Sequence, residues 1–192
     1  REKLKLLLRK KLKLLLRRKR NLSVNIGLTG TPGTGKTSLS KLLDCNLISI
    51  NDYYPDISNG KDSEGNWLID LDKLNETIDL TQHSDTLVEG HVAHFLSKLD
   101  LVVVLRCHPD RLKERLVLRD YKDEKIRENI EAEALNIISG EAFEFYDESK
   151  VFEIDTTHSD LSVSVNSLKQ VINGNIKSEK RIDYSETIMD WY

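Results

Sequence analysis

The run Gly30-Thr31-Pro32-Gly33-Thr34-Gly35-Lys36-Thr37 constrains this chain more than any other feature, because it fits the pattern of a glycine, four residues and Gly-Lys-Ser/Thr. Alternating apolar residues over 22–28 predict a strand before it, and leucines at helical spacing over 37–44 predict a helix after it. Between such elements, glycines let the backbone curl so that its N–H groups point at a phosphate. The sequence therefore predicts a P-loop that binds a nucleoside triphosphate.

Lys36 and Thr37 carry the expected chemistry of this loop. In P-loops the lysine reaches the β- and γ-phosphates, and the hydroxyl of the next residue binds Mg²⁺. The alternative is a glycine-rich turn that binds nothing, and the matching elements on both sides argue against it. The motif does not identify the group that receives the phosphate.

Short apolar runs alternate with helical patterns along the chain. This alternation predicts the α/β fold class, with a parallel sheet covered by helices on both faces and ligands beyond the carboxyl ends of the strands. Five strands are expected at Val24–Leu28, Leu47–Ile50, Thr86–Glu89, Leu101–Leu105 and Val151–Ile154. Helices are expected at Thr37–Leu43, Leu71–Thr77, Arg111–Arg119, Glu124–Ile138 and Leu161–Ile172. Glycine and aspartate cluster between Asp52 and Asp70, so this stretch is expected to be a mobile excursion rather than sheet.

The length of 192 residues fits one well-buried domain rather than two. A composition of 39% hydrophobic and 32% charged residues is typical of a soluble globular protein somewhat rich in charge. Cys45 and Cys107 are too few for a disulfide framework or a zinc site, and they indicate buried or free thiols in a reducing cytoplasm. No apolar run approaches the roughly 20 residues of a membrane-spanning helix, so no transmembrane segment is expected.

Residues 1–20 differ in charge from the remainder at 21–192, which we interpret as the globular domain. They hold 11 Lys/Arg and one Glu, a net +10, so the other residues carry −13 of the total of −3. This basic, leucine-rich leader has three open interpretations: a solvated extension, a helix on an anionic membrane, or a contact with an RNA backbone. The acidic body is a poor general binder of nucleic acid, since phosphate contacts dominate that affinity.

The third expected strand ends in Glu89-Gly90-His91. A carboxylate at the end of a strand beside a P-loop can support nucleotide-bound Mg²⁺, because hard cations take oxygen ligands. His91 would then face the γ-phosphate, where an imidazole can orient a water or relay a proton. A surface acid and a structural histidine are the alternatives. His94 completes a His-x-x-His pattern, but two histidines without further ligands do not make a zinc site.

Arg111, Arg115 and Arg119 are four residues apart and are expected on one face of a helix. Guanidinium groups stabilise the charge that spreads over phosphoryl oxygens during transfer, so this row can form a lid over phosphates. The alternative for Arg111 and Arg115 is a solvated face paired with nearby acids. Arg119, at the expected helix end, is the best lid candidate, and we place the lid at about 118–128.

Residues 51–74 are expected to form a flap over the phosphate acceptor. Tyr53, Tyr54 and Trp67 can stack on a base, although aromatic residues are as often part of a core. These residues do not fix the identity of the acceptor.

Further segments follow the P-loop in order: Val88-Glu-Gly-His-Val-Ala-His94, Val102-Val-Val-Leu-Arg106, Arg115-Leu-Val-Leu-Arg-Asp-Tyr121, Lys125-Ile-Arg-Glu-Asn-Ile-Glu-Ala-Glu133 and Asp155-Thr-Thr157. In these segments the chain resembles the adenylate kinase isoenzyme 6 family, which includes the coilin-interacting nuclear ATPase, and it looks more like the archaeal members. The resemblance covers roughly residues 22–192. It implies a P-loop NTPase fold of the nucleoside-monophosphate-kinase type, with a flap and a short lid without zinc. The run Asp52-Tyr-Tyr-Pro55 departs from the family, and the leader has no counterpart in it.

The resemblance also implies the reaction ATP + AMP ⇌ 2 ADP with slow ATPase activity, and a role in small ribosomal subunit maturation through a ribosomal protein of the platform. It assigns ATP binding to Gly33, Gly35, Lys36, Thr37 and Ser38, the metal and hydrolysis motif to Glu89 and His91, and the lid to Arg119. On this basis Lys36, His91 and Arg119 are the expected catalytic residues, with Mg²⁺ held by Thr37 and Glu89. Two alternatives stay open: a ribosome-assembly ATPase that gates a protein partner, and another small-molecule kinase on the same fold.

Overall fold

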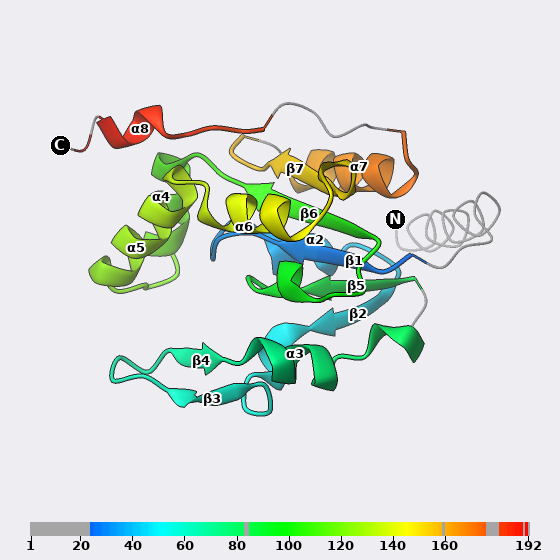
Figure 1. Ribbon diagram of the computed structural model, residues 1–192. Coiled ribbons are helices and arrows are strands. Elements are labelled where there is room, and N and C mark those ends of the chain that lie inside the picture. Colours follow the sequence, from blue (N-terminus) through cyan, green and yellow to red (C-terminus); the bar gives the residue numbers. More distant parts are fainter. Residues whose placement is uncertain (1–23, 83–84, 159, 176–180, 190, 192) are drawn as a thin grey trace, which may run out of the picture.

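The computed structural model describes residues 24–82, 85–158, 160–175, 181–189 and 191 (Figure 1). Its central sheet has five parallel strands in the order β2-β5-β1-β6-β7. The strand bounds are β1 Ile26–Thr29, β2 Asn46–Ser49, β5 Thr86–Glu89, β6 Leu101–Arg106 and β7 Val151–Asp155. The predicted α/β fold with five parallel strands is confirmed, while the leader at 1–20 lies outside the described residues.

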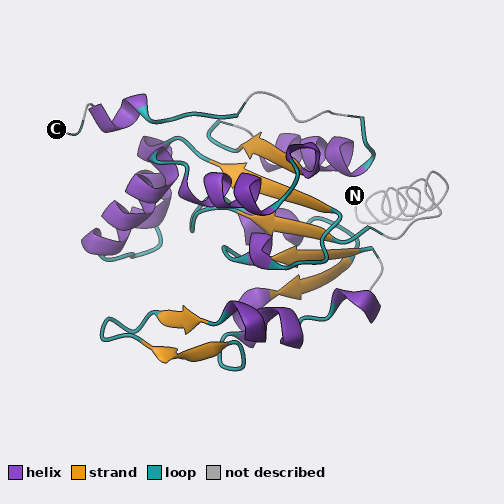
Figure 2. Ribbon diagram, in the orientation of Figure 1, coloured by secondary structure: helices purple, strands orange, loops and turns teal. Residues whose placement is uncertain are grey.

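Helices cover both faces of the sheet, as Figure 2 shows by colour. Their bounds are α2 Lys36–Ser40, α3 Leu71–Thr77, α4 Pro109–Val117, α5 Asp123–Ala134, α6 Ile137–Phe145, α7 Leu161–Ile172 and α8 Glu186–Met189. The helices α2 and α7 pack on one face, and α3 and α6 on the other, while α4 and α5 pack on each other. No helix in the described part of the chain is long and apolar enough to cross a membrane.

Strand β6 shows how the sequence builds this two-sided core. Successive side chains of a strand point to opposite faces of the sheet. Val102 and Val104 join the cluster that contains Leu74 of α3, while Val103 and Leu105 join the cluster on the side of α2 and α7. A strand buried on both faces needs apolar residues at every position, and the run 101–105 supplies them.

The stretch between Asp52 and Asp70 contains a two-stranded antiparallel hairpin, so the prediction of an excursion without sheet is wrong there. Strand β3 (Ser58–Lys61) pairs with β4 (Trp67–Ile69) apart from the main sheet. The turn between the strands is held by the Asp62 carboxylate, which accepts two backbone N–H groups. The pairing satisfies backbone groups in a segment whose polar sequence hides its strands.

One expected helix is in fact two. Helix α5 ends at Ala134, Asn136 adopts a left-handed φ of 58°, and α6 begins at the next residue. The prediction of a single helix over Glu124–Ile138 is therefore wrong. Asparagine tolerates this conformation because its short polar side chain can hydrogen-bond locally, so it interrupts a pattern that is otherwise continuous.

Candidate functional site

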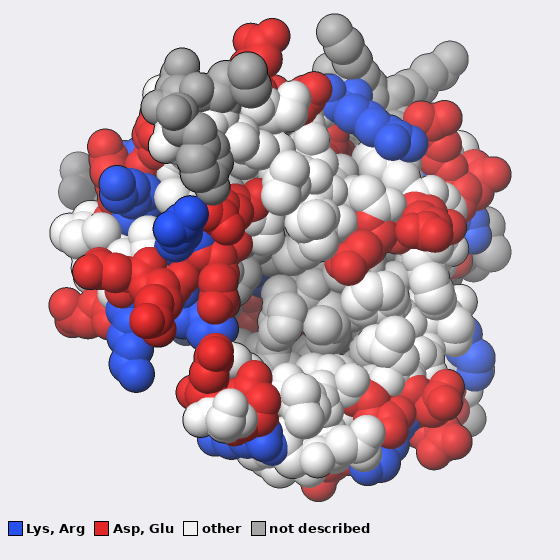
Figure 3. Space-filling view, turned by 60° about the vertical axis from the view of Figure 1, so that its left-hand side comes forward, with Lys and Arg blue, Asp and Glu red and all other residues white. Residues whose placement is uncertain are grey.

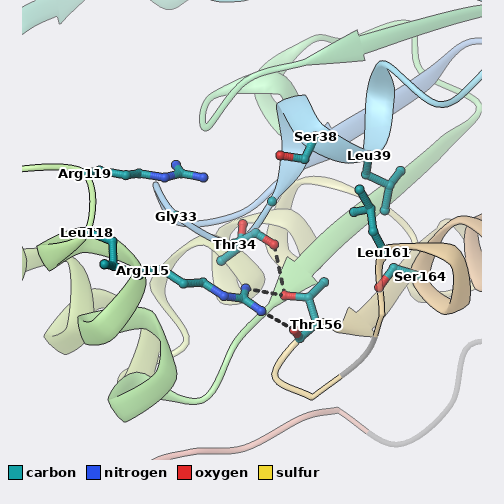
Figure 4. A pocket seen from close by; sticks show the side chains of 11 residues that line it. Gly33, Thr34, Ser38, Leu39, Arg115, Leu118, Arg119, Thr156, Leu161 and Ser164 are labelled. Carbon is teal, nitrogen blue, oxygen red and sulfur yellow. Dashed lines mark hydrogen bonds between the residues drawn. The ribbon is translucent and has the colours of Figure 1, made fainter.

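The loop between β1 and α2 borders a cavity of about 350 Å³ (Figure 4). Gly33 and Gly35 have φ angles of 96° and 105°, which residues with a side chain rarely adopt. A Cβ atom at Gly33 would lie 2.7 Å from the side chain of Leu112 in α4. The loop therefore requires both glycines for its curvature, and Gly33 also for its close approach to α4. Ser38 lies on the cavity wall with them.

Lys36, the first residue of α2, folds back over this loop. Its Nζ atom donates to the carbonyl oxygens of Gly30 at 2.5 Å and Thr31 at 3.1 Å. Burial lowers the pKa of Lys36 to about 8, although nearby Glu89 and Glu133 act in the opposite direction. The ammonium group is thus held by neutral acceptors, and charged phosphate oxygens form stronger hydrogen bonds than these.

Thr37 and Glu89 come together from α2 and from the end of β5. The Thr37 hydroxyl lies 3.2 and 3.0 Å from the two Glu89 carboxylate oxygens. Ser49, at the end of β2, donates to the same carboxylate at 3.1 Å, and the sequence reasoning did not identify it. One carboxylate and two hydroxyls are an all-oxygen donor set, which fits a hard cation such as Mg²⁺ that completes its shell with water and phosphate.

In the described part of the chain, protein side chains alone do not supply the ligands of a metal site. Among the residues that the structure describes, no three His, Cys, Asp or Glu side chains gather closely enough to hold a metal ion. A cation at Glu89 would therefore depend on the nucleotide for most of its ligands, as Mg²⁺ commonly does in phosphoryl-transfer enzymes.

His91 follows β5 and lies beneath the flap at 51–74. Its Nδ1 atom is 2.8 Å from the Tyr54 hydroxyl, and Tyr54 packs against Trp67 with ring centroids 6.4 Å apart. Burial lowers the pKa of His91 to about 4, and the charge of Lys36 contributes, so the imidazole is neutral at pH 7. Two of the three predicted flap aromatics thus meet over His91, and stacking on a base stays a prediction.

The three arginines do not share one helical face, because α4 runs from Pro109 to Val117 and Arg119 lies in the turn beyond it. Proline suits the first position of a helix through its fixed φ, and it starts α4 two residues earlier than predicted. Arg111 is exposed and pairs with Glu114. Arg111 therefore lies on a solvated helical face and is paired with an acid, which is the alternative to a role in the lid.

Arg115 and Arg119 reach the cavity from the side of α4, opposite the P-loop (Figure 4). Arg115 donates to the Thr156 carbonyl at 2.5 Å and to its hydroxyl at 3.2 Å, and that hydroxyl donates to the Thr34 carbonyl at 2.9 Å. Arg115 thereby anchors α4 to the loop after β7. The side chain of Arg119 makes no hydrogen bond or ion pair with the residues that the structure describes, so its guanidinium group is available to a phosphate.

Glu133 of α5 is a second residue that the sequence reasoning did not place in the site. Its buried carboxylate accepts hydrogen bonds from the Thr31 hydroxyl, from Nε of Arg106 at 2.8 Å and from the Cys107 N–H at 3.0 Å. It thus ties α5 to the P-loop and to the end of β6. The segment 125–133 belongs to the resemblance, but nothing in its spacing indicates a partner 102 residues away.

The flap and the lid at 118–128 approach each other at the hairpin turn. Nζ of Lys125, near the start of α5, lies 3.8 Å from a carboxylate oxygen of Glu64 in the hairpin turn. Figure 3 shows a hollow on this face, with charged side chains crowded on the side of α4 and α5 and uncharged residues lining much of it. Glu64 is exposed, and such ion pairs stabilise by at most about 1 kcal/mol.

Comparison with known proteins places this site in a family. A family model described as an AAA domain matches residues 26–136. A protein named "Putative adenylate kinase" from Methanosarcina barkeri is 37% identical over 182 residues, covering 86% of this chain and 96% of that protein. Proteins of the same name from Methanococcus maripaludis and Methanocaldococcus jannaschii are 40% and 34% identical, covering 74% and 88% of this chain and 85% and 97% of their own lengths.

Solved structures share the architecture at much lower identity. Shikimate kinase from Acinetobacter baumannii superposes with a TM-score of 0.57 and 17% identity, covering 83% of this chain and 98% of that chain. Thymidylate kinase from Candida albicans gives 0.53 and 11%, covering 84% and 96%. These likenesses establish a P-loop kinase fold. Together with the sequence relatives, matched over most of their length, they show that the chain belongs to the archaeal family of adenylate kinase-like proteins and is a nucleotide kinase.

Proposed function

We propose that this chain is an adenylate kinase of the isoenzyme 6 type, which transfers the γ-phosphoryl group of MgATP to AMP and hydrolyses ATP slowly. The observation that carries the proposal is the convergence of Lys36, Thr37 and Glu89 at the carboxyl end of the sheet. Arg119 lines the same cavity as Gly33 and Ser38 (Figure 4), and its charge acts on Lys36. The name of the archaeal relatives supports AMP as the acceptor.

The residues divide the task in the way that phosphoryl transfer requires. Negative charge spreads over the phosphoryl oxygens in the transition state, so catalysis consists mainly of positioning and electrostatic stabilisation. Lys36 and the backbone N–H groups of residues 33–38 hold the donor phosphates, and Arg119 stabilises the transferred group. Thr37 and Glu89 hold the cation, which when bound neutralises phosphate charge. Closure of the flap and the lid excludes water.

The charge of the flap favours two other candidates. One is an ATPase whose nucleotide cycle gates a platform ribosomal protein, and the other is a kinase with another small acceptor. The flap at 51–74 has six Asp/Glu, two Lys and no Arg. Lys73 is bonded to Asn59 at 2.7 Å, and Nζ of Lys61 lies 4.3 Å from the centroid of the Trp67 ring. An acidic flap is poorly suited to hold the phosphate of a monophosphate, so this group would depend on the lid.

An acceptor screen separates these candidates. The full chain with MgATP is offered AMP, dAMP, CMP, UMP and GMP in turn, and hydrolysis without an acceptor is the baseline. The proposal predicts that AMP gives ADP well above the baseline and faster than the other monophosphates. Turnover that no monophosphate raises, together with nucleotide-dependent binding of the ribosomal protein, would favour the ATPase instead.

A further inference from the structure

Arg106 is a buried charge that has no part in the phosphoryl transfer described above. It ends β6, its side chain is 1% exposed, and the C-terminal segment 181–184 lies against its guanidinium group. All of its N–H groups are bonded, to Glu133, Glu153, Asn136 and the carbonyl oxygen of Ile182. A guanidinium group has five donors in a fixed planar fork, so it is fully satisfied only when every acceptor is in place. The surroundings of Arg106 are therefore complete only with the C-terminal segment docked.

The C-terminal segment, drawn in red in Figure 1, runs past the end of β6 toward α8. Ile182 bonds to both members of an ion pair: its carbonyl accepts from Arg106 at 2.9 Å, and its N–H donates to Glu153 of β7 at 2.6 Å. The Tyr184 ring covers the same guanidinium group, with its centroid 5.3 Å from Cζ of Arg106. At this distance an arginine is attracted to the face of an aromatic ring. The backbone and the ring of the segment together cover Arg106.

Arg106 connects this segment to the P-loop through Glu133. One carboxylate oxygen of Glu133 accepts from Nε of Arg106 at 2.8 Å, and the other accepts from the Thr31 hydroxyl. The carbonyl oxygen of Thr31 in turn accepts from Nζ of Lys36 at 3.1 Å. Arg106, Glu133 and Thr31 are all buried, so a continuous chain of buried contacts runs from the C-terminal segment to the lysine of the P-loop.

The ring of Tyr184 contributes more to this arrangement than its hydroxyl. The hydroxyl lies 3.4 Å from the Thr157 hydroxyl, which is long for a hydrogen bond between two oxygens. The ring, in contrast, keeps water from the pair of Arg106 and Glu133. The attraction between two charges falls steeply as the surrounding dielectric constant rises, so water that reached this pair would weaken it. Glu133 would then be held less firmly against Thr31.

We propose that Tyr184 is a positioning residue for the donor nucleotide, because it covers Arg106 and thereby keeps the P-loop in the shape that aims Lys36 at phosphate. The inference rests on the proposed function only in requiring that the P-loop binds ATP. It assigns a part in nucleotide affinity to a segment that contributes no residue to the lining of the cavity. By linkage, bound nucleotide must in turn hold this segment in place.

The test compares nucleotide affinity in two variants of the full chain. Tyr184→Ala removes the cover of Arg106, while Tyr184→Phe keeps the ring and is the matched control. The probe is β,γ-methylene-ATP with Mg²⁺, and calorimetry gives its dissociation constant. We expect Tyr184→Ala to raise this constant at least about fivefold, the low end of the usual coupling between two sites. Tyr184→Phe should stay within about twofold of the wild type.

Thr31→Val distinguishes positioning from general support of the fold, because it breaks the chain of contacts at the P-loop. In this background, Tyr184→Ala should change the dissociation constant by less than about twofold, since the two sites are no longer coupled. It should still lower the melting temperature as much as it does in the wild type. An equal loss of affinity in both backgrounds, or no loss in the wild type, would overturn the inference.

A measurement on the wild type does not depend on the folding of any Tyr184 variant. The N–H of Ile182 is bonded to Glu153, so its hydrogen exchange reports how often the segment leaves its place. Saturation with the same analogue should slow this exchange at least about fivefold, because coupling between two sites is reciprocal. An exchange rate that the analogue leaves unchanged would overturn the inference.

These outcomes are separable from the failure of the proposed function. Binding of the analogue and exchange at Ile182 require no phosphate acceptor. If the wild type transfers phosphate to no monophosphate, the proposed function fails, and both measurements still decide whether Tyr184 positions the P-loop.

Discussion

Lys36 changes its protonation state at a pH close to neutral, because its surroundings lower its pKa. Its Nζ atom is bonded to two backbone carbonyls of the loop, and burial lowers its pKa to about 8. A lysine in water would keep its proton until above pH 10. In the free protein, Lys36 therefore loses its attraction for phosphate over a pH range in which a lysine in water keeps its proton.

This shift predicts that kcat/KM for MgATP falls as the pH rises through about 8, by about tenfold for each further pH unit. The fall follows from the sign of the shift, because the protonated form that attracts phosphate is present only below the lowered pKa. A pH–rate profile measures it. Lys36→Arg is the control, since a guanidinium stays charged and should give a lower rate without this fall. A profile of the wild type that is flat to pH 10 would contradict the assignment.

Glu89 and Ser49 predict a dependence on Mg²⁺ concentration. Glu89→Gln should raise the Mg²⁺ concentration for half-maximal activity at least tenfold, because the variant removes the only carboxylate of the donor set. Ser49→Ala should raise it by a smaller factor, because this variant removes one neutral hydroxyl and keeps the carboxylate. A titration of activity with Mg²⁺ checks both. Unchanged half-maximal concentrations would show that the cation is held elsewhere.

At the scale of elements, the helices that carry the lid are tied to the P-loop at two separate places. Arg115 of α4 holds Thr156, whose hydroxyl reaches the loop at Thr34. Glu133 of α5 holds Thr31 from the other side. The position of the lid is therefore linked to the shape of the phosphate-binding loop, and changes in these contacts should reach nucleotide affinity.

Thr31 offers a clean test of the contact with α5. Thr31→Val keeps the shape of the side chain but removes the donor to Glu133, and hydrogen bonds to charged groups contribute about 1.5–3 kcal/mol. We expect the free energy of unfolding to fall by about that amount and KM for ATP to rise. Thr31→Ser keeps the hydroxyl and should retain most of both properties. Equal behaviour of the two variants would show that the hydroxyl is not what matters.

The elements also show why the sequence predicts some features and hides others. The strands β1, β5, β6 and β7 were predictable because each is a mostly apolar run with most of its residues buried, such as 101–105, whereas the edge strand β2 is only partly buried. Helix α6 was not, because a single Asn136 in a left-handed conformation divides a continuous helical pattern. The hairpin was hidden as well, since the polar strand Ser58–Lys61 lacks the alternation that signals a half-buried strand.

Some residues of the candidate site were predictable from the sequence, and others were not. Lys36, Thr37 and Glu89 could be predicted because a local motif or a strand end places them. Ser49, Thr156 and Glu133 could not, because their contacts join segments far apart in the chain. The prediction that Arg115 and Arg119 share one helical face was wrong, because α4 ends at Val117 and Arg119 lies in the turn beyond it.

On the scale of the whole molecule, the site lies between three bodies: the sheet with its P-loop, the flap and the lid. The flap bonds to His91 through Tyr54, and its Ile57 and Leu74 are buried in the core on one face of the sheet. The base of the flap is therefore packed on the sheet, while its hairpin turn meets the lid through the exposed ion pair of Glu64, which fits a tip that moves as the site opens and closes. The packed cores on the two faces of the sheet provide the rigid base.

This division of the molecule predicts that residues 1–20 are dispensable for catalysis. A chain that begins near Leu22 keeps the P-loop, the flap and the lid, so kcat and KM should stay within about twofold of the full chain. Binding to anionic vesicles or RNA at low salt should be weaker in the shortened chain, because the removed segment carries a net +10. Lost nucleotide binding in the shortened chain would contradict this prediction.

The central claim is that the P-loop end of the sheet transfers phosphate from MgATP to AMP. The most direct measurement follows the labelled γ-phosphoryl group of ATP in the presence of AMP, for the wild type and for Lys36→Ala. Our account predicts label in newly formed ADP with the wild type, and a rate lower by about 10²–10³-fold in the variant, the range for loss of one electrostatic contact to the transition state. Label that appears only in inorganic phosphate, or equal rates for both proteins, would contradict it.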